Sequence, residues 1–149
     1  MMNRMVIMIG LQASGKSTFC KSYLAEYKHI SLDDLNTRNK ERLAVMSCIE
    51  NHEDLVIDNT NPSSEDRQKY FEMAKGSGYR IIGYYMRSVI AECIPRNEQR
   101  TGKARIPTAA IAATSKKIEL PTYDEGFDEL YYAEITDNGF EVSEWRKED

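Results

Sequence analysis

The sequence of 149 residues has no apolar run as long as a membrane-spanning helix, and its few cysteines form no recognisable pattern. Crossing a bilayer takes about 20 apolar residues, and the stretch from Val6 to Gly10 is also too short for the core of a signal peptide. Cys20, Cys48 and Cys93 form no C-x-x-C pair and have no metal-ligand spacing to the two histidines. These absences argue against a membrane protein or a disulfide-stapled secreted domain. They predict reduced, buried thiols in a cytoplasmic protein.

The sequence also lacks internal repeats, low-complexity tracts and any segment typical of a linker between domains. Its length and its composition, 41% hydrophobic and 30% charged, fit a single globular domain over residues 1–149. The charge is unevenly distributed, because residues 119–149 contain 2 basic and 11 acidic residues whereas residues 1–118 contain 18 and 13. The net charge of −4 therefore arises from the C-terminal segment, and the rest of the chain, at +5, does not exclude an anionic substrate.

What the sequence does contain is the segment Gly10-Leu11-Gln12-Ala13-Ser14-Gly15-Lys16-Ser17, which matches the phosphate-binding pattern G-x-x-x-x-G-K-[ST]. It lies between an apolar run at 5–9 and an amphipathic stretch that begins near Lys16, as a strand–loop–helix context requires. We expect Lys16 to reach the β- and γ-phosphates of ATP and the Ser17 hydroxyl to ligate Mg²⁺. The residues predicted to bind the nucleotide are Gly10, Ser14, Gly15, Lys16, Ser17 and Thr18, the last of them touching at most an outer phosphate.

Strand and helix patterns alternate along the rest of the chain. Strands are predicted at 5–9, 29–32, 55–58 and 80–86, with a terminal hairpin of 131–136 and 140–142. Helices are predicted from Lys16, over 35–50, after the cap and first turn Asn61-Pro62, over 89–94 with a kink or a break at Pro95, and from Pro107. This order predicts an α/β fold of the P-loop NTPase type, with three layers, a mostly parallel central sheet and a helical lid. The active site is expected at the carboxyl ends of the strands.

Acidic residues follow two of the predicted strands. Asp33 and Asp34 follow the second strand and Asp58 closes the third, so all three are expected at the same sheet edge as the phosphate loop. A kinase needs a carboxylate that accepts the proton of the acceptor hydroxyl, and acids that hold Mg²⁺. Either Asp33 or Asp34 could instead cap the helix that follows, because aspartate is a favoured N-cap residue.

A pair of arginines marks the predicted lid. Arg96 and Arg100 lie four positions apart on a predicted helix and therefore share one face. Placed over the phosphates, they would neutralise charge that develops on the transferred phosphoryl group. A solvated basic face paired with Glu92 and Glu98 is the alternative, and the glycine and basic residues of 102–105 favour a mobile basic lid.

The other residues able to carry chemistry are isolated. His29 and His52 are each expected to be structural or solvated, and Trp145 is expected to be a packing anchor. The tyrosines at 84, 85, 131 and 132 are predicted to belong to the core of the strands.

Taken in this order, the loop, the acids and the arginines resemble the kinase module of 5′-hydroxyl polynucleotide kinases, within the P-loop kinases. The resemblance includes Val56-Ile57-Asp58-Asn59-Thr60-Asn61-Pro62, Ile106-Pro107 and the segment 120–127. The Asp-Asn-Thr-Asn-Pro block is more specific than the phosphate loop, because P-loop proteins at large do not share it. The resemblance implies an ATP- and Mg²⁺-dependent kinase that acts on the 5′ end of DNA or RNA.

The resemblance also implies roles for single residues. Asp33 is implied as the general base for the 5′-hydroxyl, and Lys16 and Ser17 as the residues that hold phosphates and Mg²⁺. Arg100, assisted by Arg96, is implied at the transferred phosphate. The residues implied on the acceptor side are Asp34, Arg38, Asp58 and Asn61, of which Asp58 could also hold the metal.

One position departs from the family pattern. The bacteriophage member of the family has an arginine three residues after its general base that binds the acceptor's phosphate, whereas this chain has Asn36 there and Arg38 two residues further on. Because no D-x-D-x-[TV] phosphatase motif occurs, kinase activity alone is expected. Two other hypotheses stay open: a P-loop kinase of a small metabolite, nucleoside or sugar, which Asn36 favours, and a nucleotide-dependent ATPase or switch without an acceptor.

Overall fold

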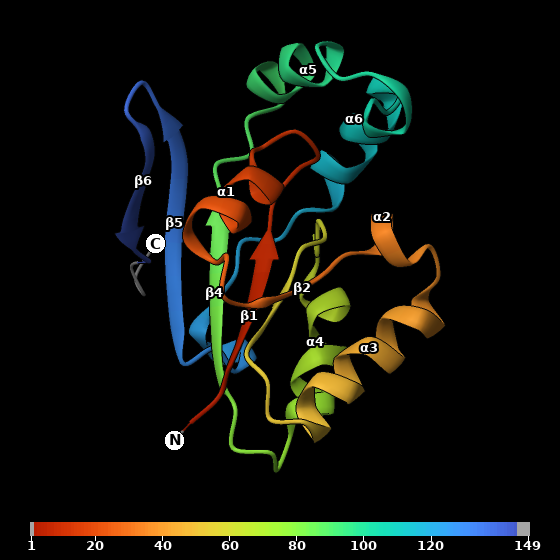
Figure 1. Cartoon of the computed structure of the whole chain (residues 1–149). Coiled ribbons are helices and arrows are strands. Elements are labelled where there is room, and N and C mark those ends of the chain that lie inside the picture. The colour runs from red at the N-terminus through yellow and green to blue at the C-terminus, as the bar shows by residue number, and fades with distance from the viewer. Residues whose placement is uncertain (1, 146–149) are drawn as a thin grey trace.

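Strand β1 (Arg4–Ile9) is buried along five of its six residues because it has neighbours on both sides in the sheet. The computed structural model describes residues 2–145 and shows six strands in the order β2-β3-β1-β4-β5-β6 (Figure 1). The other strands are β2 (Lys28–Ile30), β3 (Leu55–Ile57), β4 (Arg80–Met86), β5 (Glu129–Thr136) and β6 (Gly139–Glu144). All neighbouring pairs are parallel except β5 and β6, which form the predicted terminal hairpin.

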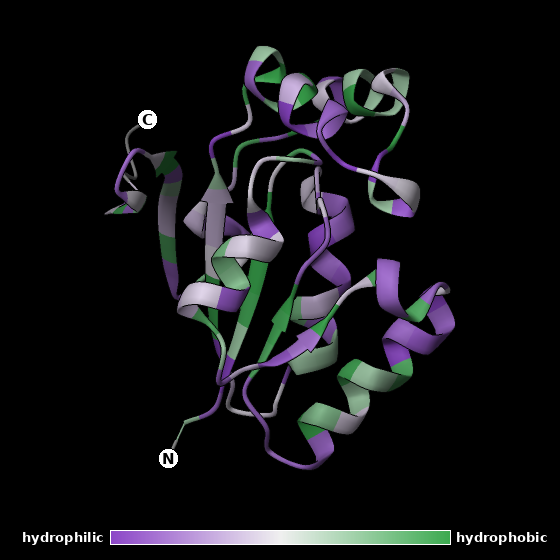
Figure 2. Ribbon diagram, turned by 45° about the horizontal axis from the view of Figure 1, so that its top comes forward, coloured by the Kyte–Doolittle hydropathy of each residue, from purple (hydrophilic) through white to green (hydrophobic). Residues whose placement is uncertain are grey.

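Helices cover both faces of this sheet because successive residues of a strand point to opposite sides. Met5 and Ile7 of β1 join a core with residues of α3 (Arg38–Glu50) and α4 (Ser64–Ala74), whereas Val6 and Met8 pack on the other side with α1 (Lys16–Tyr23). In Figure 2 strands β1 and β3 are accordingly mostly hydrophobic, and much of the surface of the helices is hydrophilic. The three-layer α/β fold predicted from the sequence is confirmed.

Two further helices, α5 (Ile90–Glu98) and α6 (Thr108–Lys117), form a lid over the end of the sheet where β1 and β4 finish (Figure 1). They are joined through the short 3₁₀ turn η1 (Gly102–Ala104), and a second such turn, η2 (Tyr123–Glu125), precedes β5. Cys93 of α5 and Ile111 of α6 pack around Leu11 of the phosphate loop, so the lid rests directly on that loop. Within residues 2–145, no helix combines the length and apolarity that crossing a bilayer requires.

The predicted helix at 35–50 corresponds to α3, which begins three residues later, and a short helix that was not predicted, α2 (Leu32–Leu35), precedes it. Ser31 caps α2 by accepting the backbone N–H of Asp33, so neither Asp33 nor Asp34 is the cap and both lie in its first turn. Asn36 ends α2 with a φ of 70°. Asparagine tolerates this left-handed conformation better than most residues. The separation of the two helices is a local effect of Asn36 that apolar periodicity does not register.

The structure shows neither the helix cap predicted at Asn61 nor a break at Pro95. The helix after Pro62 is capped by Ser63, whose hydroxyl accepts the N–H of Asp66, and not by Asn61. Pro95 lies inside α5 without dividing it. Proline in a helix interior removes one backbone hydrogen bond, but buried residues on either side hold this helix, Cys93 in the lid core and Asn97 through hydrogen bonds to the backbone of Ile106.

Candidate active site

The segment 10–17 connects the end of β1 to the start of α1, as the phosphate-loop pattern predicts. Ala13 and Gly15 both have left-handed backbones, with φ of 64° and 102°. The backbone conformation favours glycine at position 15, and a Cβ there would also lie 2.9 Å from the terminal Cδ1 of Ile135. The loop therefore curves around the N-terminus of α1 and is pressed against the β5–β6 hairpin.

Lys16 is buried inside this curve. Its ammonium donates hydrogen bonds to the carbonyl oxygens of Gly10, at 2.9 Å, and Leu11, at 2.7 Å. Burial lowers the pKa of Lys16 to about 8, although the negative charge of Asp58 acts in the opposite direction. A cation held in a desolvated pocket without a full counter-charge is a favourable partner for an anionic ligand.

Other groups of the loop also fit a phosphate. The buried Ser14 hydroxyl has no hydrogen-bond partner among the described residues and can donate to a phosphate oxygen. No side chain in that part of the structure caps α1, whose N-cap is Gly15. A buried hydroxyl and an uncapped helix N-terminus are both donors for an anion, so the loop has the donor set that a triphosphate requires. Thr18, by contrast, is an exposed residue of α1 outside the residues that line the cleft described below.

Asp58 sits immediately after β3, and its carboxylate is almost completely buried. Its Oδ2 accepts a hydrogen bond from Ser17 Oγ at 2.7 Å and lies 2.8 Å from Nε2 of His29. Burial by itself raises the pKa of Asp58, but the hydrogen bonds from His29 and Ser17 and the charge of Lys16 outweigh it and leave the pKa below its usual value. A serine hydroxyl beside an ionised carboxylate offers the hard oxygen ligands that Mg²⁺ prefers.

His29 was predicted to be structural or solvated, and the structure places it in this constellation. Its hydrogen bond to Asp58 raises the pKa of the imidazole, and its Nδ1 faces Asp34 Oδ2 at 3.6 Å. The sequence pattern does not reveal this because β2 is an edge strand of three residues, too short for alternation to show which side chains turn toward the site.

A cleft of about 520 Å³ joins the phosphate loop to the lid and to α2. Lys16, Ser17 and Asp58 line it from the sheet side, and Asp33 and Arg38 line it from the opposite side. From the lid, the basic residues that reach it are Arg100 and Lys103. The structure thus brings six of the predicted site residues to one cleft: Lys16, Ser17, Asp33, Arg38, Asp58 and Arg100.

Two residues predicted on the acceptor side and one predicted lid arginine do not line the cleft. Asp34 has a largely exposed side chain directed at His29 and does not line the cleft. Asn61 is buried with a φ of 43°, and its amide donates to the carbonyl of Met8 at 2.7 Å, which is a structural position rather than a substrate-binding one. Arg96 donates to the carbonyl of Ala13 at 3.2 Å and so connects the lid to the phosphate loop instead of facing the cleft.

The Asp-Asn-Thr-Asn-Pro block, residues 58–62, is hydrogen-bonded to several separate elements of the fold. Asp58 contacts α1 and β2 as described above, and the carbonyl of Thr60 accepts the N–H of Gly10 at 3.0 Å. Asn59 accepts the backbone N–H of Leu32 at 2.9 Å, which fixes the start of α2 next to Asp33. The block therefore holds the nucleotide side and the opposite side of the cleft in register.

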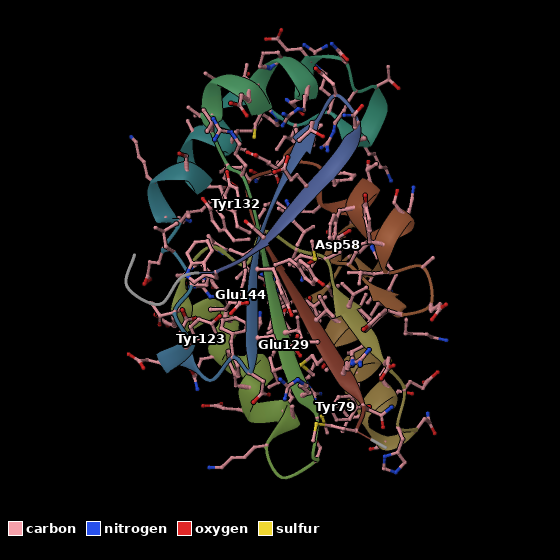
Figure 3. All side chains as sticks on the ribbon, turned by 90° about the vertical axis from the view of Figure 1, so that its left-hand side faces the viewer. Asp58, Tyr79, Tyr123, Glu129, Tyr132 and Glu144 are labelled. Atoms are coloured by element: carbon pink, nitrogen blue, oxygen red, sulfur yellow. The ribbon has the colours of Figure 1, made fainter. Side chains whose placement is uncertain are left out.

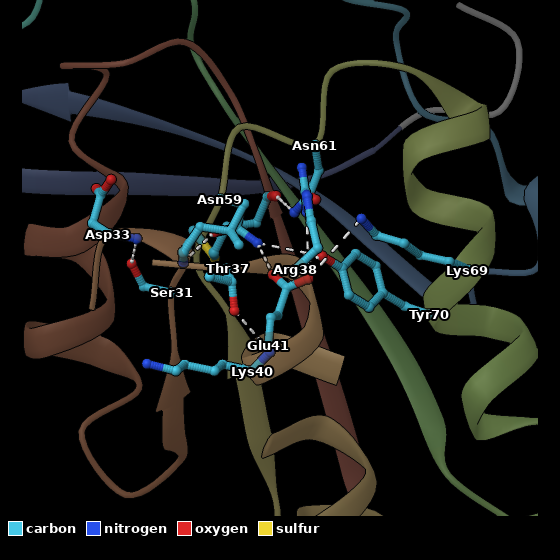
Figure 4. A network of polar contacts seen from close by, with 12 residues as sticks. Ser31, Asp33, Thr37, Arg38, Lys40, Glu41, Asn59, Asn61, Lys69 and Tyr70 are labelled. Atoms are coloured by element: carbon cyan, nitrogen blue, oxygen red, sulfur yellow. Dashed lines mark hydrogen bonds and ion pairs between the residues drawn. The ribbon is translucent and has the colours of Figure 1, made fainter. Parts of the chain in front are cut away.

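Asn59 also belongs to a polar network that the sequence did not predict (Figure 4). The carboxylate of Glu41, in the first turn of α3, is buried and accepts hydrogen bonds from Asn59 and from the hydroxyl of Tyr70. Nη1 of Arg38 donates to the other oxygen of this carboxylate at 3.3 Å. A buried charge needs such partners, and the network orients Arg38 at the edge of the cleft. A glutamate within an otherwise ordinary helix pattern gives no sign of being buried.

No protein-family model matches the chain. It is 27% identical over 129 residues to a bifunctional polynucleotide phosphatase/kinase of Schizosaccharomyces pombe, covering 82% of this chain. It is 30% identical over 138 residues to a putative bifunctional polynucleotide phosphatase/kinase of Acanthamoeba polyphaga mimivirus, covering 85% of this chain. The matches cover 31% and 32% of those relatives, so the chain spans about a third of their length. The resemblance to polynucleotide kinases drawn from the motifs is confirmed.

Solved structures with a similar fold include a gluconokinase from Sinorhizobium meliloti, with a TM-score of 0.62 and 17% identity over 87% of this chain and 81% of that one. Another is Kti12 from Chaetomium thermophilum in complex with ADP-AlF3, with a TM-score of 0.67 and 18% identity over 86% of this chain and 87% of that one. The chain has the fold of the P-loop kinases. The same P-loop kinase fold recurs in the Pnkp1/Rnl/Hen1 complex, where the match has a TM-score of 0.56 and 16% identity over 99% of this chain and 47% of that one.

Proposed function

We propose that this P-loop kinase module transfers the γ-phosphate of ATP to the 5′-hydroxyl of a nucleic acid. The observation that carries the proposal is that one cleft is lined by the nucleotide-side residues Lys16, Ser17 and Asp58 and, across from them, by Asp33 and Arg38. A phosphoryl transferase needs a site for the donor, a base and a site for the acceptor within reach of one another. The similarity to polynucleotide phosphatase/kinases supports a nucleic-acid end as the acceptor.

In this proposal each residue has one task. Lys16 and the loop N–H groups bind the triphosphate, and Asp33, exposed at the cleft wall, accepts the proton of the attacking hydroxyl. Ser17 and Asp58 would hold Mg²⁺, which offsets phosphate charge when bound. Arg100 faces the cleft from the lid and stabilises charge on the transferred phosphoryl group.

We further propose that Arg38 binds the acceptor's phosphate in place of the arginine absent at position 36. Asn36 has the left-handed backbone that ends α2, and it does not line the cleft. Arginine in that conformation costs about 1 kcal/mol or more. Arg38, two residues further on, does line the cleft and is oriented by Glu41.

The test is transfer of label from γ-labelled ATP to a 5′-hydroxyl oligonucleotide, with the same oligonucleotide carrying a 5′-phosphate as the unreactive control. Asp33→Asn is expected to lower turnover at least about 100-fold, as loss of a general base does. Asp34→Asn is the matched control, because Asp34 is the adjacent acid and lies outside the cleft lining. It is expected to retain turnover within a few-fold.

The acceptor panel also separates the alternatives. Label found on a nucleoside, gluconate or another sugar, but not on the oligonucleotide, would show that the protein is a kinase with a different acceptor from the one proposed. Label found only as free phosphate, with every acceptor unlabelled, would refute phosphoryl transfer to an acceptor and favour an ATPase or switch.

A further inference from the structure

Three metal-binding side chains from three different elements meet behind the phosphate loop. Cys20 lies on α1, His29 on β2 and Asp58 after β3, and one ligand atom of each lies within 4.8 Å of the others. Elsewhere in residues 2–145, no other group of histidine, cysteine, aspartate or glutamate ligand atoms meets this closely. Phosphoryl transfer as proposed above uses Asp58 and gives Cys20 no task.

We propose that Cys20, His29 and Asp58 form a binding site for a thiophilic divalent cation, with Zn²⁺ as the best-fitting ion, and that its binding inhibits the kinase. A thiolate, an imidazole and a carboxylate are ligands that Zn²⁺ accepts together, whereas Mg²⁺ selects oxygen ligands alone. The site therefore differs from the proposed magnesium site in chemistry, although the two share Asp58.

The geometry is close to that of a tetrahedral site. With metal–ligand distances of about 2.0 to 2.3 Å, the ligand atoms of such a site lie about 3 to 4 Å apart. The trio, at 2.8 Å between His29 Nε2 and Asp58 Oδ2 and at most 4.8 Å overall, needs movements of about 1 Å to reach it. Ser17 Oγ, which lies 2.7 Å from Asp58 Oδ2, is a neighbouring oxygen that can complete the shell.

The charges also favour a divalent cation. Cys20 and Asp58 are both buried, so two negative ligands here are costly unless a cation of charge +2 neutralises them. When the cation binds, the Cys20 thiol releases its proton to solvent and its sulfur becomes the ligand. His29 binds through Nε2 and carries its proton on Nδ1, where Asp34 Oδ2 at 3.6 Å is the partner that metal-bound histidines commonly have.

Inhibition follows from the shared carboxylate, and this part of the proposal rests on the proposed kinase function. When the Asp58 carboxylate binds Zn²⁺, it no longer accepts the hydrogen bond from the Ser17 hydroxyl. It is then also unable to help hold the Mg²⁺ that accompanies the triphosphate. Because the Cys20 sulfur and the His29 nitrogen are ligands that Mg²⁺ does not select, Mg²⁺ in excess competes only for the oxygen ligands.

Binding is tested with Co²⁺, which replaces Zn²⁺ and shows a near-ultraviolet charge-transfer band when a thiolate is bound. The intact protein is expected to develop this band with one equivalent of Co²⁺ and to lose it when Zn²⁺ is added. Cys20→Ala should abolish the band. Cys48→Ala and Cys93→Ala are matched controls, because both thiols are free and buried but lie outside the trio, and both should retain it.

Circular dichroism and thermal unfolding check that Cys20→Ala folds. His29→Gln provides a second variant, with the thiol intact and an expected affinity for Co²⁺ at least tenfold lower. A wild-type protein without the band, a Cys20→Ala variant that keeps it, or a Cys48→Ala variant that loses it would each overturn the site.

Inhibition is measured separately, by label transfer in millimolar Mg²⁺ with and without micromolar Zn²⁺. The wild type is expected to lose at least tenfold in turnover and to regain it with a chelator, whereas Cys20→Ala is expected to keep its turnover in Zn²⁺. Equal inhibition of both proteins would refute the inhibitory role. Absence of any label transfer would refute the kinase function, and the cobalt band would still test the site.

Discussion

At the scale of single residues, the buried Lys16 ammonium makes nucleotide binding sensitive to pH. Its pKa is lowered to about 8, so the charged fraction of Lys16 in the free protein falls as the pH rises through that value. ATP binds the charged form, and its affinity should therefore fall above pH 8, by at most about tenfold per pH unit for one linked proton. Equilibrium titration with ATP from pH 7 to 9.5 measures this dependence.

Lys16→Met is the control for that titration. It should bind ATP weakly with an affinity that does not change over the same pH range, because no titrating ammonium remains. An affinity that falls equally in Lys16→Met would assign the pH dependence to another group.

Arg100 and Arg96 are equal in charge and close in sequence, but their side chains lie in different places. Arg100 lines the cleft, whereas Arg96 donates to Ala13. Arg100→Lys should lose far more turnover than ATP affinity, because a point charge cannot replace the planar guanidinium at a phosphoryl group. Arg96→Lys should lose little turnover. Steady-state kinetics of both variants measure these losses. Equal losses in kcat and ATP affinity for Arg100→Lys would mean that Arg100 only binds the phosphate in the ground state.

At the scale of elements, the lid and the phosphate loop are tied together by side chains. Gln12 donates to the hydroxyl of Thr114 on α6 at 3.0 Å, in addition to the contact from Arg96. Thr114→Val removes an interaction worth about 1 kcal/mol and leaves the loop less ordered before ATP binds. The KM for ATP should therefore rise about fivefold with little change in kcat. Thr114→Ser keeps the hydroxyl and should behave as the wild type, so a rise in KM in both variants would contradict the role of this hydrogen bond.

The elements also show where sequence patterns are sufficient. Strand β4 was predicted with its observed bounds, and α1, α6 and the terminal hairpin within a few residues, because apolar runs, turn residues and the phosphate-loop pattern act locally. The short helix α2, which ends at Asn36, and the continuation of α5 through Pro95 were not predicted. Both depend on contacts with distant segments or on a single backbone conformation, which periodicity cannot express.

At the scale of the whole molecule, some residues of the candidate site could be predicted from the sequence and others could not. Lys16, Ser17, Asp33, Asp58 and Arg100 could be found because each lies in a motif or after a predicted strand. His29 and Glu41 could not be found in this way, because each acts through a hydrogen bond to a residue 29 positions away, His29 to Asp58 and Glu41 to Tyr70. In Figure 3 Asp58 lies nearer the lid than Tyr79, which lies near the opposite end of the sheet.

One buried ion pair joins the C-terminal third of the chain to the rest. The guanidinium of Arg67, on α4, is fully buried and binds both carboxylate oxygens of Glu125, at 2.8 and 3.0 Å. It also donates to the carbonyls of Asn61 and Pro62, beside the block that shapes the cleft. Glu125→Ala leaves this charge buried without a counter-ion, which costs about 3 to 5 kcal/mol of unfolding free energy.

That loss should lower the Tm by about 10 °C or more in a chain of this size, measured by thermal unfolding. Glu92→Ala, which breaks the exposed pair with Arg87, is the matched control and should change the Tm little. The double variant Arg67→Met/Glu125→Leu removes both charges and should unfold at a higher temperature than Glu125→Ala. If the double variant is no more stable than Glu125→Ala, the damage comes from lost packing and carbonyl contacts, and the unpaired charge is not what destabilises the fold.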